Sequence, residues 1–330
     1  MTPPSPQELG FVVIGRNEGE RLAACLRSLL PLQAPIVYAD SGSTDGSPDR
    51  AAELGATVVR LDPARAMNAS RGRHEGYQAL KVDHPSLRFV QFLDGDCVLA
   101  ERWIDEASAF LEQHQRAAVV CGRRFEAHPD ASFYNKLCDE EWNTPCGRVA
   151  SSGGDALMRV SALDQVGDFD PSLMASEEPE LAARLREADW EIWRIDALMT
   201  EHDAKIFTFK AYWRRAMRAG FGYAQAWMRT AKLSHRINGR LLASSLFWMA
   251  ILPLGLIVLA ALLRHPTLLV LLPLIYFLQI ARMAASIEIG DPYQWRKAFV
   301  IFAIKSGELI GAARAIFGGQ SRTAIDYKGN

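Results

Sequence analysis

The 330-residue chain contains only five cysteines, and their spacing matches no metal-binding or disulfide pattern. They include no Cys-x-x-Cys pair and are odd in number, so the sequence predicts neither a zinc site nor a disulfide framework. A reducing, cytosolic setting for about the first 240 residues is the simplest interpretation. The first ten residues also lack the cationic and apolar pattern of a signal peptide, so nothing there directs the N-terminus across a membrane.

The chain has almost no net charge, because 37 lysines and arginines face 38 aspartates and glutamates. This balance argues against a general nucleic-acid binder, which needs a strongly basic domain. The distribution is uneven, however, since the segment 210–240 carries cations and no acid. Its eight cations are Lys210, Arg214, Arg215, Arg218, Arg229, Lys232, Arg236 and Arg240.

Charge is missing altogether from Leu241 to Leu263, a run of 23 residues. As a helix with a rise of ~1.5 Å per residue it is roughly 34 Å long, enough for a bilayer core of about 30 Å. A polar break at 264–266 and an apolar stretch at 267–281 complete a predicted hairpin of two spanning helices. The alternative is a buried helical pair in a soluble domain. The segment 298–317 mixes charged and apolar residues, which indicates an amphipathic helix in the membrane interface or a third span.

Cations flank this apolar region on both sides, in the block 210–240 and at Arg296 and Lys297. The positive-inside rule puts them on the cytoplasmic side. We therefore expect a protein of the cytoplasmic membrane whose residues 1–205 face the cytoplasm. The same cations can bind anionic lipid head groups, and the alternative is that they serve as a topology signal only.

Residues 9–205 alternate short apolar runs with helical patterns, which predicts an α/β fold with a mostly parallel sheet covered by helices on both faces. The predicted strands are 11–14, 36–39, 57–61, 88–93, 118–122 and 191–195. The predicted helices are 20–30, 67–80 and 101–114. Open sheets of this kind bind ligands at the carboxyl ends of their strands.

Three aspartates fall at such strand ends: Asp40, Asp94 and Asp96. One crevice can therefore contain all three. Asp94 and Asp96 belong to an Asp-x-Asp triplet that closes a buried strand pattern, and such a pair can share Mg²⁺ or Mn²⁺ with the phosphates of a substrate. The alternative for an isolated triplet is a solvated turn.

Five blocks of the sequence resemble, in order, the motifs of inverting family-2 glycosyltransferases. They are Phe11–Glu18, Tyr38–Ser47, Phe92–Asp96, Gly153–Arg159 with Val166–Asp170, and Ser176–Leu181. The resemblance implies a GT-A fold, in which a Rossmann-like nucleotide-binding half joins an acceptor-binding half over one sheet. The expected domains are a GT-A domain at 1–205, a basic amphipathic helical linker at 206–240 and a membrane-anchoring hairpin with an interfacial helix at 241–330. The specificity determinants are expected in the loops from about 126 to 152.

On the donor side, Glu18 and Asp40 are expected to accept hydrogen bonds from the base or ribose, and the resemblance places Asp40 against the nucleoside. Glu18 has the alternative role of complementing a helix dipole. Arg73 matches the family's Ala-Arg-Asn-x-Gly pattern and is expected to reach the nucleotide, unless it is a surface helix arginine. Asp96 is the preferred metal ligand, with Asp94 on the ribose or a metal-bound water.

Three further groups of residues complete the expected site. His202 is a candidate metal ligand because many GT-A enzymes use a late histidine, although a lone histidine is more often structural. Glu178 aligns with the family's general base, with Glu177 as the runner-up because the family's Asp is replaced here by Glu; acids gathered for dipole and capping reasons are the alternative. Arg215 or Arg218 can clamp the diphosphate, although the Gln-x-x-Arg-Trp motif of processive relatives is absent.

The predicted function is a Mn²⁺- or Mg²⁺-dependent inverting glycosyltransferase. It is expected to move one sugar from a UDP- or GDP-sugar to a lipid-linked or membrane acceptor at the cytoplasmic face, with no nucleic-acid partner. Two alternatives stay open: a polyprenyl-phosphate glycosyltransferase, whose acceptor needs no base, and a non-catalytic scaffold that keeps the sugar-nucleotide fold.

Overall fold

The computed structural model of the protein describes residue 5, residues 7–285 and residues 290–318. The chain forms two compact units. The first contains Met1–Lys205 and Met228–Ile237, and the second contains Ile206–Trp227 and Asn238–Asn330.

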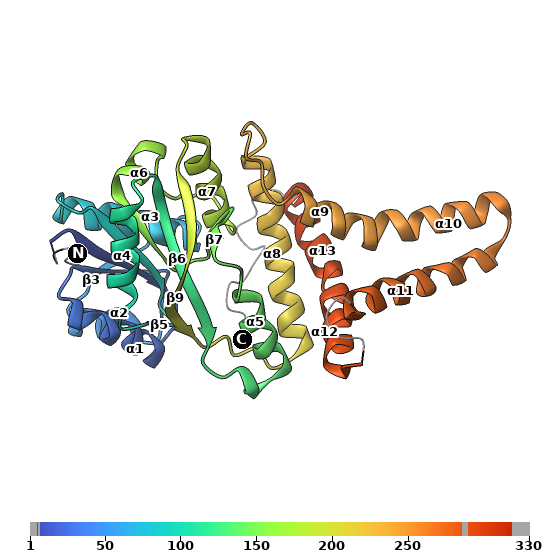
Figure 1. Ribbon diagram of the computed structural model, residues 1–330, viewed down its shortest axis with the longest axis horizontal. Coiled ribbons are helices and arrows are strands. Elements are labelled where there is room, and N and C mark those ends of the chain that lie inside the picture. The colour runs from blue at the N-terminus through green and yellow to red at the C-terminus, as the bar shows by residue number, and fades with distance from the viewer. Residues whose placement is uncertain (1–4, 6, 286–289, 319–330) are drawn as a thin grey trace. The chain divides into compact units, whose positions relative to one another are not determined.

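The first unit is built on one nine-stranded sheet (Figure 1). The strand order is β3-β2-β1-β4-β8-β6-β9-β5, and β7 pairs with β9 beside this path. The strands are β1 (Leu9–Gly15), β2 (Ile36–Asp40), β3 (Thr57–Arg60), β4 (Phe89–Asp94), β5 (Cys97–Leu99), β6 (Ala117–Glu126), β7 (Gly147–Arg148), β8 (Ala156–Arg159) and β9 (Glu191–His202).

The sheet has a parallel half and a mixed half. Strands β3, β2, β1 and β4 run parallel, as the sequence predicts, and the apolar side chains of β1 and β4 are almost wholly buried. Beyond β4 the short strand β8 runs antiparallel between β4 and β6, while β6 and β9 pair in parallel. The predicted α/β class with helices around one sheet is confirmed. The short strands β5, β7 and β8 were not predicted.

Helices of the first unit pack on this sheet. They are α1 (Glu20–Leu29), α2 (Ser47–Glu53), α3 (Ala69–Asp83), α4 (Trp103–Gln113), α5 (Phe133–Trp142), α6 (Val160–Val166) and α7 (Glu177–Glu187). Helix α3 lies close against β1 because glycine occurs on both sides of the contact. A Cβ on Gly76 would stand 2.7 Å from Val12, and one on Gly10 would stand 2.8 Å from Leu80.

The second unit is helical. Its elements are α8 (Phe209–Arg229), α9 (Gly239–Leu246), a π-helical turn (Phe247–Ile251), α10 (Leu252–Leu263), a 3₁₀ turn (Pro266–Val270), α11 (Leu271–Ala285), α12 (Pro292–Ala303) and α13 (Lys305–Phe317). The last two residues of α8 count with the first unit.

Two continuous helical segments of this unit are long and apolar enough to cross a membrane, Gly239–Leu263 and Pro266–Ala285. Only 6% of the most apolar window of each is buried, whereas the core helices of a soluble domain would be mostly buried. The predicted hairpin of two apolar helices is confirmed as a pair of helices that can span. No further helix among the described residues meets the same criteria.

The segment 298–317, predicted as one amphipathic helix, is divided between α12 and α13, which meet at Ile304. Helix α13 packs on α8 through glycines. A Cβ on Gly311 would collide with the carbonyl oxygen of Met217, and one on Gly220 would collide with the backbone of Glu308. Small residues allow this close approach of two helix backbones.

Candidate active site

The candidate site lies at the carboxyl ends of the parallel strands in the first unit. Asp40 ends β2 beside Gly15, and Asp94 ends β4 beside Ile14, with β1 between them. Two strand spacings separate the two aspartates, which is roughly 10 Å. The fold therefore brings these predicted residues to one edge of the sheet.

Asp40 organises the turn that follows β2. Its side chain accepts hydrogen bonds from the hydroxyl of Tyr38 at 3.0 Å and from the backbone nitrogens of Gly42 at 3.0 Å and Ser43 at 2.9 Å. The residue is only 3% exposed. A carboxylate has roughly four acceptor positions, so these three bonds leave capacity for one ligand group.

Glu18 is buried and is joined to the Asp-x-Asp turn through Arg21. Arg21 Nη2 lies 2.7 Å from Glu18 Oε2, and Arg21 Nη1 lies 3.6 Å from Asp96 Oδ2. Glu18 precedes α1 instead of lying in its first turn. Its side chain is therefore part of the strand-end cluster, and Glu20 is the acid in the first turn.

Asp94 is held by two arginines. Arg73 Nη2 donates to Oδ1 at 2.8 Å, and Arg124 Nη2 donates to Oδ2 at 3.0 Å. Both oxygens are thus engaged by cations, which favours Asp96 over Asp94 as a direct metal ligand. Sequence reasoning missed Arg124 because it ended the strand at 122. The strand continues to Glu126, which carries Arg124 to the strand-end edge.

The side chain of Asp155 is fully buried and contacts both Arg124 and the backbone of Asp94. Its oxygens accept from Arg124 Nη2 and Thr200 Oγ1 at 2.7 Å each and from the backbone nitrogen of Asp94 at 3.0 Å. Burial acts to raise the pKa of Asp155, but Arg124 and the hydrogen bonds outweigh burial, so its pKa is lowered. The sequence places Asp155 only within the motif block Gly153–Arg159, and its contact with Asp94 comes from the pairing of β4 with β8.

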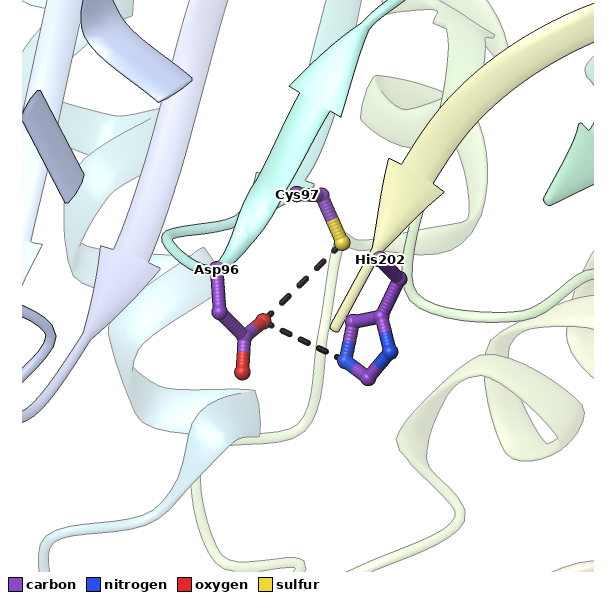
Figure 2. Close-up of side chains that lie close together, drawn as sticks. All are labelled: Asp96, Cys97 and His202. Carbon is purple, nitrogen blue, oxygen red and sulfur yellow. Dashed lines mark hydrogen bonds and ion pairs between the residues drawn. The ribbon is translucent and has the colours of Figure 1, made fainter. Parts of the chain in front are cut away.

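Asp96, Cys97 and His202 form a second group at the same edge (Figure 2). Asp96 Oδ1 lies 3.5 Å from His202 Nε2 and 3.9 Å from Cys97 Sγ. The group forms because β5 pairs antiparallel with β9, which sets Cys97 opposite His202. His202 is therefore the last residue of β9, not part of a loop after a strand that ends at 195.

The chemistry of this group suits a divalent cation such as Mn²⁺. Ligand bonds of about 2.0–2.2 Å place neighbouring donor atoms roughly 3 Å apart or more, which matches the separation of Asp96 and His202. Cys97 is a soft donor that hard cations do not favour, and burial raises the pKa of its thiol. Asp94 and Asp155 also gather near Cys97, but both already pair with Arg124, and Asp94 also pairs with Arg73.

The acid pair Glu177 and Glu178 opens helix α7, after Ser176 in a left-handed conformation with φ 61°. Arg73 reaches both acids: its Nη1 lies 2.5 Å from Glu177 Oε1, and its Nη2 lies 3.2 Å from Glu178 Oε1. The side chain of Arg73 is 2% exposed, so the alternative of a surface arginine is wrong. Arg73 links the acid pair to Asp94.

Gly154 makes room for this link. A Cβ at position 154 would collide with Arg73 Nη2 and lie 3.0 Å from Asp94 Oδ2. The glycine in the Gly153-Gly154-Asp155 block is therefore required by the close approach of charged side chains.

The environment of Glu178 raises its proton affinity. Burial and the Glu177 carboxylate raise the pKa of Glu178 to about 8, although Arg73 opposes the rise. Its side chain is 14% exposed, so it is accessible to a reactant. A carboxylate with a pKa close to the working pH is suited to take up a proton during a reaction. Glu180 instead pairs with Arg184 at 2.8 Å within the helix.

Arg215 and Arg218 belong to α8 in the second unit. The guanidinium of Arg215 lies over the ring of Tyr212 at 5.9 Å. Their contact with a diphosphate stays a prediction.

Comparison with known families agrees with this geometry. The profile of Glycosyl transferase family 2 matches residues 11–164, and that of Glycosyl transferase family group 2 matches residues 89–283. The chain is a family-2 glycosyltransferase. The matched region of this glycosyltransferase contains all of the strand-end residues described above.

Individual relatives are distant. The glycosyltransferase is 26% identical over 271 residues to the succinoglycan biosynthesis protein ExoA of Rhizobium meliloti, covering 72% of this chain and 79% of ExoA. It is 20% identical to the glycosyltransferase AglE of Haloferax volcanii, covering 64% of this chain and 71% of AglE. Among solved structures, the mannosyltransferase PcManGT from Pyrobaculum calidifontis, in complex with GDP-Man and Mn²⁺, superposes with a TM-score of 0.58 at 16% identity, covering 97% of this chain and 90% of that one. This likeness confirms the GT-A fold.

Proposed function

We propose that the protein is a metal-dependent inverting glycosyltransferase that moves one sugar from a nucleotide-sugar donor to a hydroxyl of a lipid-linked or membrane acceptor. The observation that carries the proposal is the link through Arg73. This one buried side chain joins the acid pair Glu177 and Glu178 to Asp94, two residues before Asp96. The proposal therefore puts the base and Asp94, on the ribose or a metal-bound water, in one site.

Asp40 and Glu18 are assigned to the nucleoside end of the donor, and Asp96 with His202 is assigned to the divalent cation. When bound, such a cation supplies positive charge that stabilises the departing nucleoside diphosphate. The structure of PcManGT with GDP-Man and Mn²⁺ supports a GDP-sugar with Mn²⁺ as the pair to test first, with a UDP-sugar and Mg²⁺ next.

Glu178 is assigned as the general base. Its ionised carboxylate takes the proton of the acceptor hydroxyl while that oxygen forms a bond to the anomeric carbon of the donor sugar. The bond from this carbon to the phosphate oxygen breaks, and the nucleoside diphosphate leaves with the electron pair. Attack from the face opposite the leaving group inverts the configuration in one displacement.

Arg73 is assigned as a positioning residue. Its Nη1 lies 2.5 Å from Glu177, whereas its Nη2 lies 3.2 Å from Glu178. The longer contact of Glu178 and its raised pKa favour Glu178 as the base.

The apolar hairpin is assigned to the membrane. Two helices that can span, preceded by eight cations without an acid between them, support a cytoplasmic location for the GT-A domain. The domain proposal is a GT-A domain at 1–205, a basic helical linker at 206–240 and a membrane anchor at 241–330.

The decisive experiment compares Glu178→Gln with Glu177→Gln in the full chain purified in detergent. Transfer to membrane lipid extracts and metal-dependent hydrolysis of UDP- and GDP-sugars are both measured. We expect Glu178→Gln to lower transfer by about 10²–10⁴-fold and Glu177→Gln to lower it less.

The alternatives predict different results. Near-normal transfer by Glu178→Gln would favour a polyprenyl-phosphate acceptor, whose oxygen is already anionic and needs no base. Tight binding of a nucleoside diphosphate without turnover on any lipid extract would favour the scaffold and contradict the proposal.

A further inference from the structure

The first unit has a pocket whose lining residues have not been assigned a role above. It has a volume of about 570 Å³ and is open to solvent. Its walls come from β6, β9 and the segment between α5 and β7. The lining residues include Arg123, Asn143, Cys146, Arg194, Asp196 and Leu198.

Arg194 is the unusual residue of this pocket. It is only 6% exposed, yet its hydrogen bond is to the sulfur of Cys146, at 2.9 Å from Nη1. Its Nε is buried without a hydrogen-bond partner among the described residues. No carboxylate of the described chain lies within 4.0 Å of this guanidinium. A buried cation without an anion is costly to keep, so this site is expected to receive one.

Arg123 adds a second donor. Its Nη2 pairs with Asp139 at 2.8 Å, while its Nη1 is buried without a hydrogen-bond partner among the described residues. Burial raises the pKa of Cys121, which lies near Arg194, to about 12, so that thiol supplies no negative charge at neutral pH. Asp196 also lines the pocket but is exposed. A hydroxyl-bearing anion suits this mixture of donors and one acceptor.

The local backbone builds this pocket. Between β6 and β9 the pairing shifts register, so that Cys121 faces Arg194 but Arg123 faces Leu198. Cys121 and Arg123 are two residues apart on β6, whereas their partners Arg194 and Leu198 are four residues apart on β9. The extra residues on β9 form a β-bulge, which opens space beside the strand. Gly122 permits it, since a Cβ there would lie 2.6 Å from the carbonyl oxygen of Ala197.

The pocket adjoins the candidate active site. Leu198 and Thr200 are two residues apart on β9, roughly 7 Å along the strand, with a shift of register between them, and Thr200 donates to Asp155. Asn143 directly follows Trp142, whose ring lies 5.6 Å from the guanidinium of Arg124 and 5.0 Å from the ring of His202. A molecule in the pocket can therefore extend toward the reacting centre.

We propose that this pocket is an acceptor subsite in which Arg194, with Arg123, binds an anionic group of the acceptor, either a phosphate or a carboxylate. The acceptor role rests on the proposed function, whereas the anion binding does not. A diphosphate that links a glycan to its lipid and an acidic sugar both offer this chemistry.

The test measures the melting temperature of the full chain in detergent with EDTA, at constant ionic strength, while pyrophosphate, glucuronate or glucose is added. We expect a saturable rise with pyrophosphate or glucuronate and none with glucose. The anion with the larger effect identifies the source as a lipid diphosphate or an acidic sugar.

Variants assign the effect to the pocket. Arg194→Met should melt at the same or a higher temperature without anion, because an uncompensated buried charge has been removed, and it should lose the response. Arg194→Lys should keep part of the response. Arg148→Gln is the matched control, since Arg148 lies on neighbouring β7, is exposed and pairs with Glu191 at 2.9 Å. It should respond like the wild type, and any pyrophosphate response that survives in Arg194→Met belongs to the donor site.

Equal responses of the wild type and Arg194→Met to both anions would overturn the proposal, as would no response of the wild type to either. A lower melting temperature of Arg194→Met without anion would show that the arginine serves the fold alone.

The acceptor role has its own readout: Arg194→Met should raise the KM for the acceptor at least about tenfold, with the KM for the donor and the metal dependence unchanged. An unchanged acceptor KM would contradict the acceptor role. If no acceptor is ever turned over, the proposed function fails while the melting experiment still decides the anion site.

Discussion

Two groups of acids meet at Cys97, and they differ in how closely their charges are paired. Asp94 and Asp155 are bound by Arg124 at 2.7–3.0 Å, and Asp155 is fully buried. Asp96 lies 3.5 Å from His202 and 3.6 Å from Arg21, beyond normal hydrogen-bond length, with 17% of its side chain exposed. The charges of the Arg124 group are thus closely paired within the protein, and the proposed function assigns the Asp96–His202 group to a metal ligand site.

The largest expected difference between the two groups is in how much each contributes to the free energy of unfolding. Asp155→Asn removes a charge from a buried pair and should lower the free energy of unfolding by about 3–5 kcal/mol. Because the pKa of Asp155 is lowered from 3.8, its contribution is present above that pH and is lost as the pH falls through the folded pKa. The variant should therefore lose stability at pH 7 and approach the wild type in acid. Chemical denaturation at neutral and acid pH checks this. Equal stability of Asp155→Asn and the wild type at pH 7 would contradict the structural role of Asp155.

Asp96→Asn should show the opposite pattern. We expect transfer to fall at least about 10²–10³-fold, the scale of one lost group that stabilises transition-state charge. The melting temperature without metal should stay close to that of the wild type, because the ion pairs of Asp96 with His202 and Arg21 are long and partly exposed, and such pairs contribute little to folding. Activity and thermal melting of the same preparation test both statements. A variant that unfolds would place Asp96 with the structural acids.

His202→Asn should weaken cation binding without unfolding the protein. Loss of the imidazole should reduce Mn²⁺ affinity by at least about 10–100-fold, a loss typical even of outer-shell partners. Activity should recover when Mn²⁺ is raised, and Mg²⁺ should be affected less because imidazole suits it less well. Metal titrations of activity measure this. An unchanged Mn²⁺ requirement would assign His202 to packing against Trp142 alone.

The smallest expected effect is on the pH profile. Glu178 must be ionised to act as a base, and its pKa of about 8 means that the ionised fraction falls as the pH falls. The kcat/KM for the acceptor should drop roughly fivefold between pH 8 and pH 7. Glu177→Gln should shift this limb to lower pH, since a neighbouring negative charge is removed. If the acidic limb of the pH profile does not move in Glu177→Gln, a group other than Glu178 is responsible for it.

The strong predictions from sequence were those that depend on local pattern. The buried runs of β1, β2 and β4 specified the parallel half of the sheet, and the acids that follow these strands had to share one edge. The 23 uncharged residues from Leu241 predicted a long apolar helix. Short elements were missed, because β5 and β8 have three and four residues and no period to detect.

The amino-acid sequence by itself determined the family, the acid-bearing strand ends and the apolar hairpin, because each is written in contiguous residues. Only the tertiary structure decided which acids are paired. Arg124 reaches Asp94 and Asp155 because β4, β8 and β6 lie side by side, and His202 meets Asp96 because β5 returns against β9. Charge pairing depends on distances of a few ångströms between segments far apart in the chain, and such distances exist only after the sheet has formed.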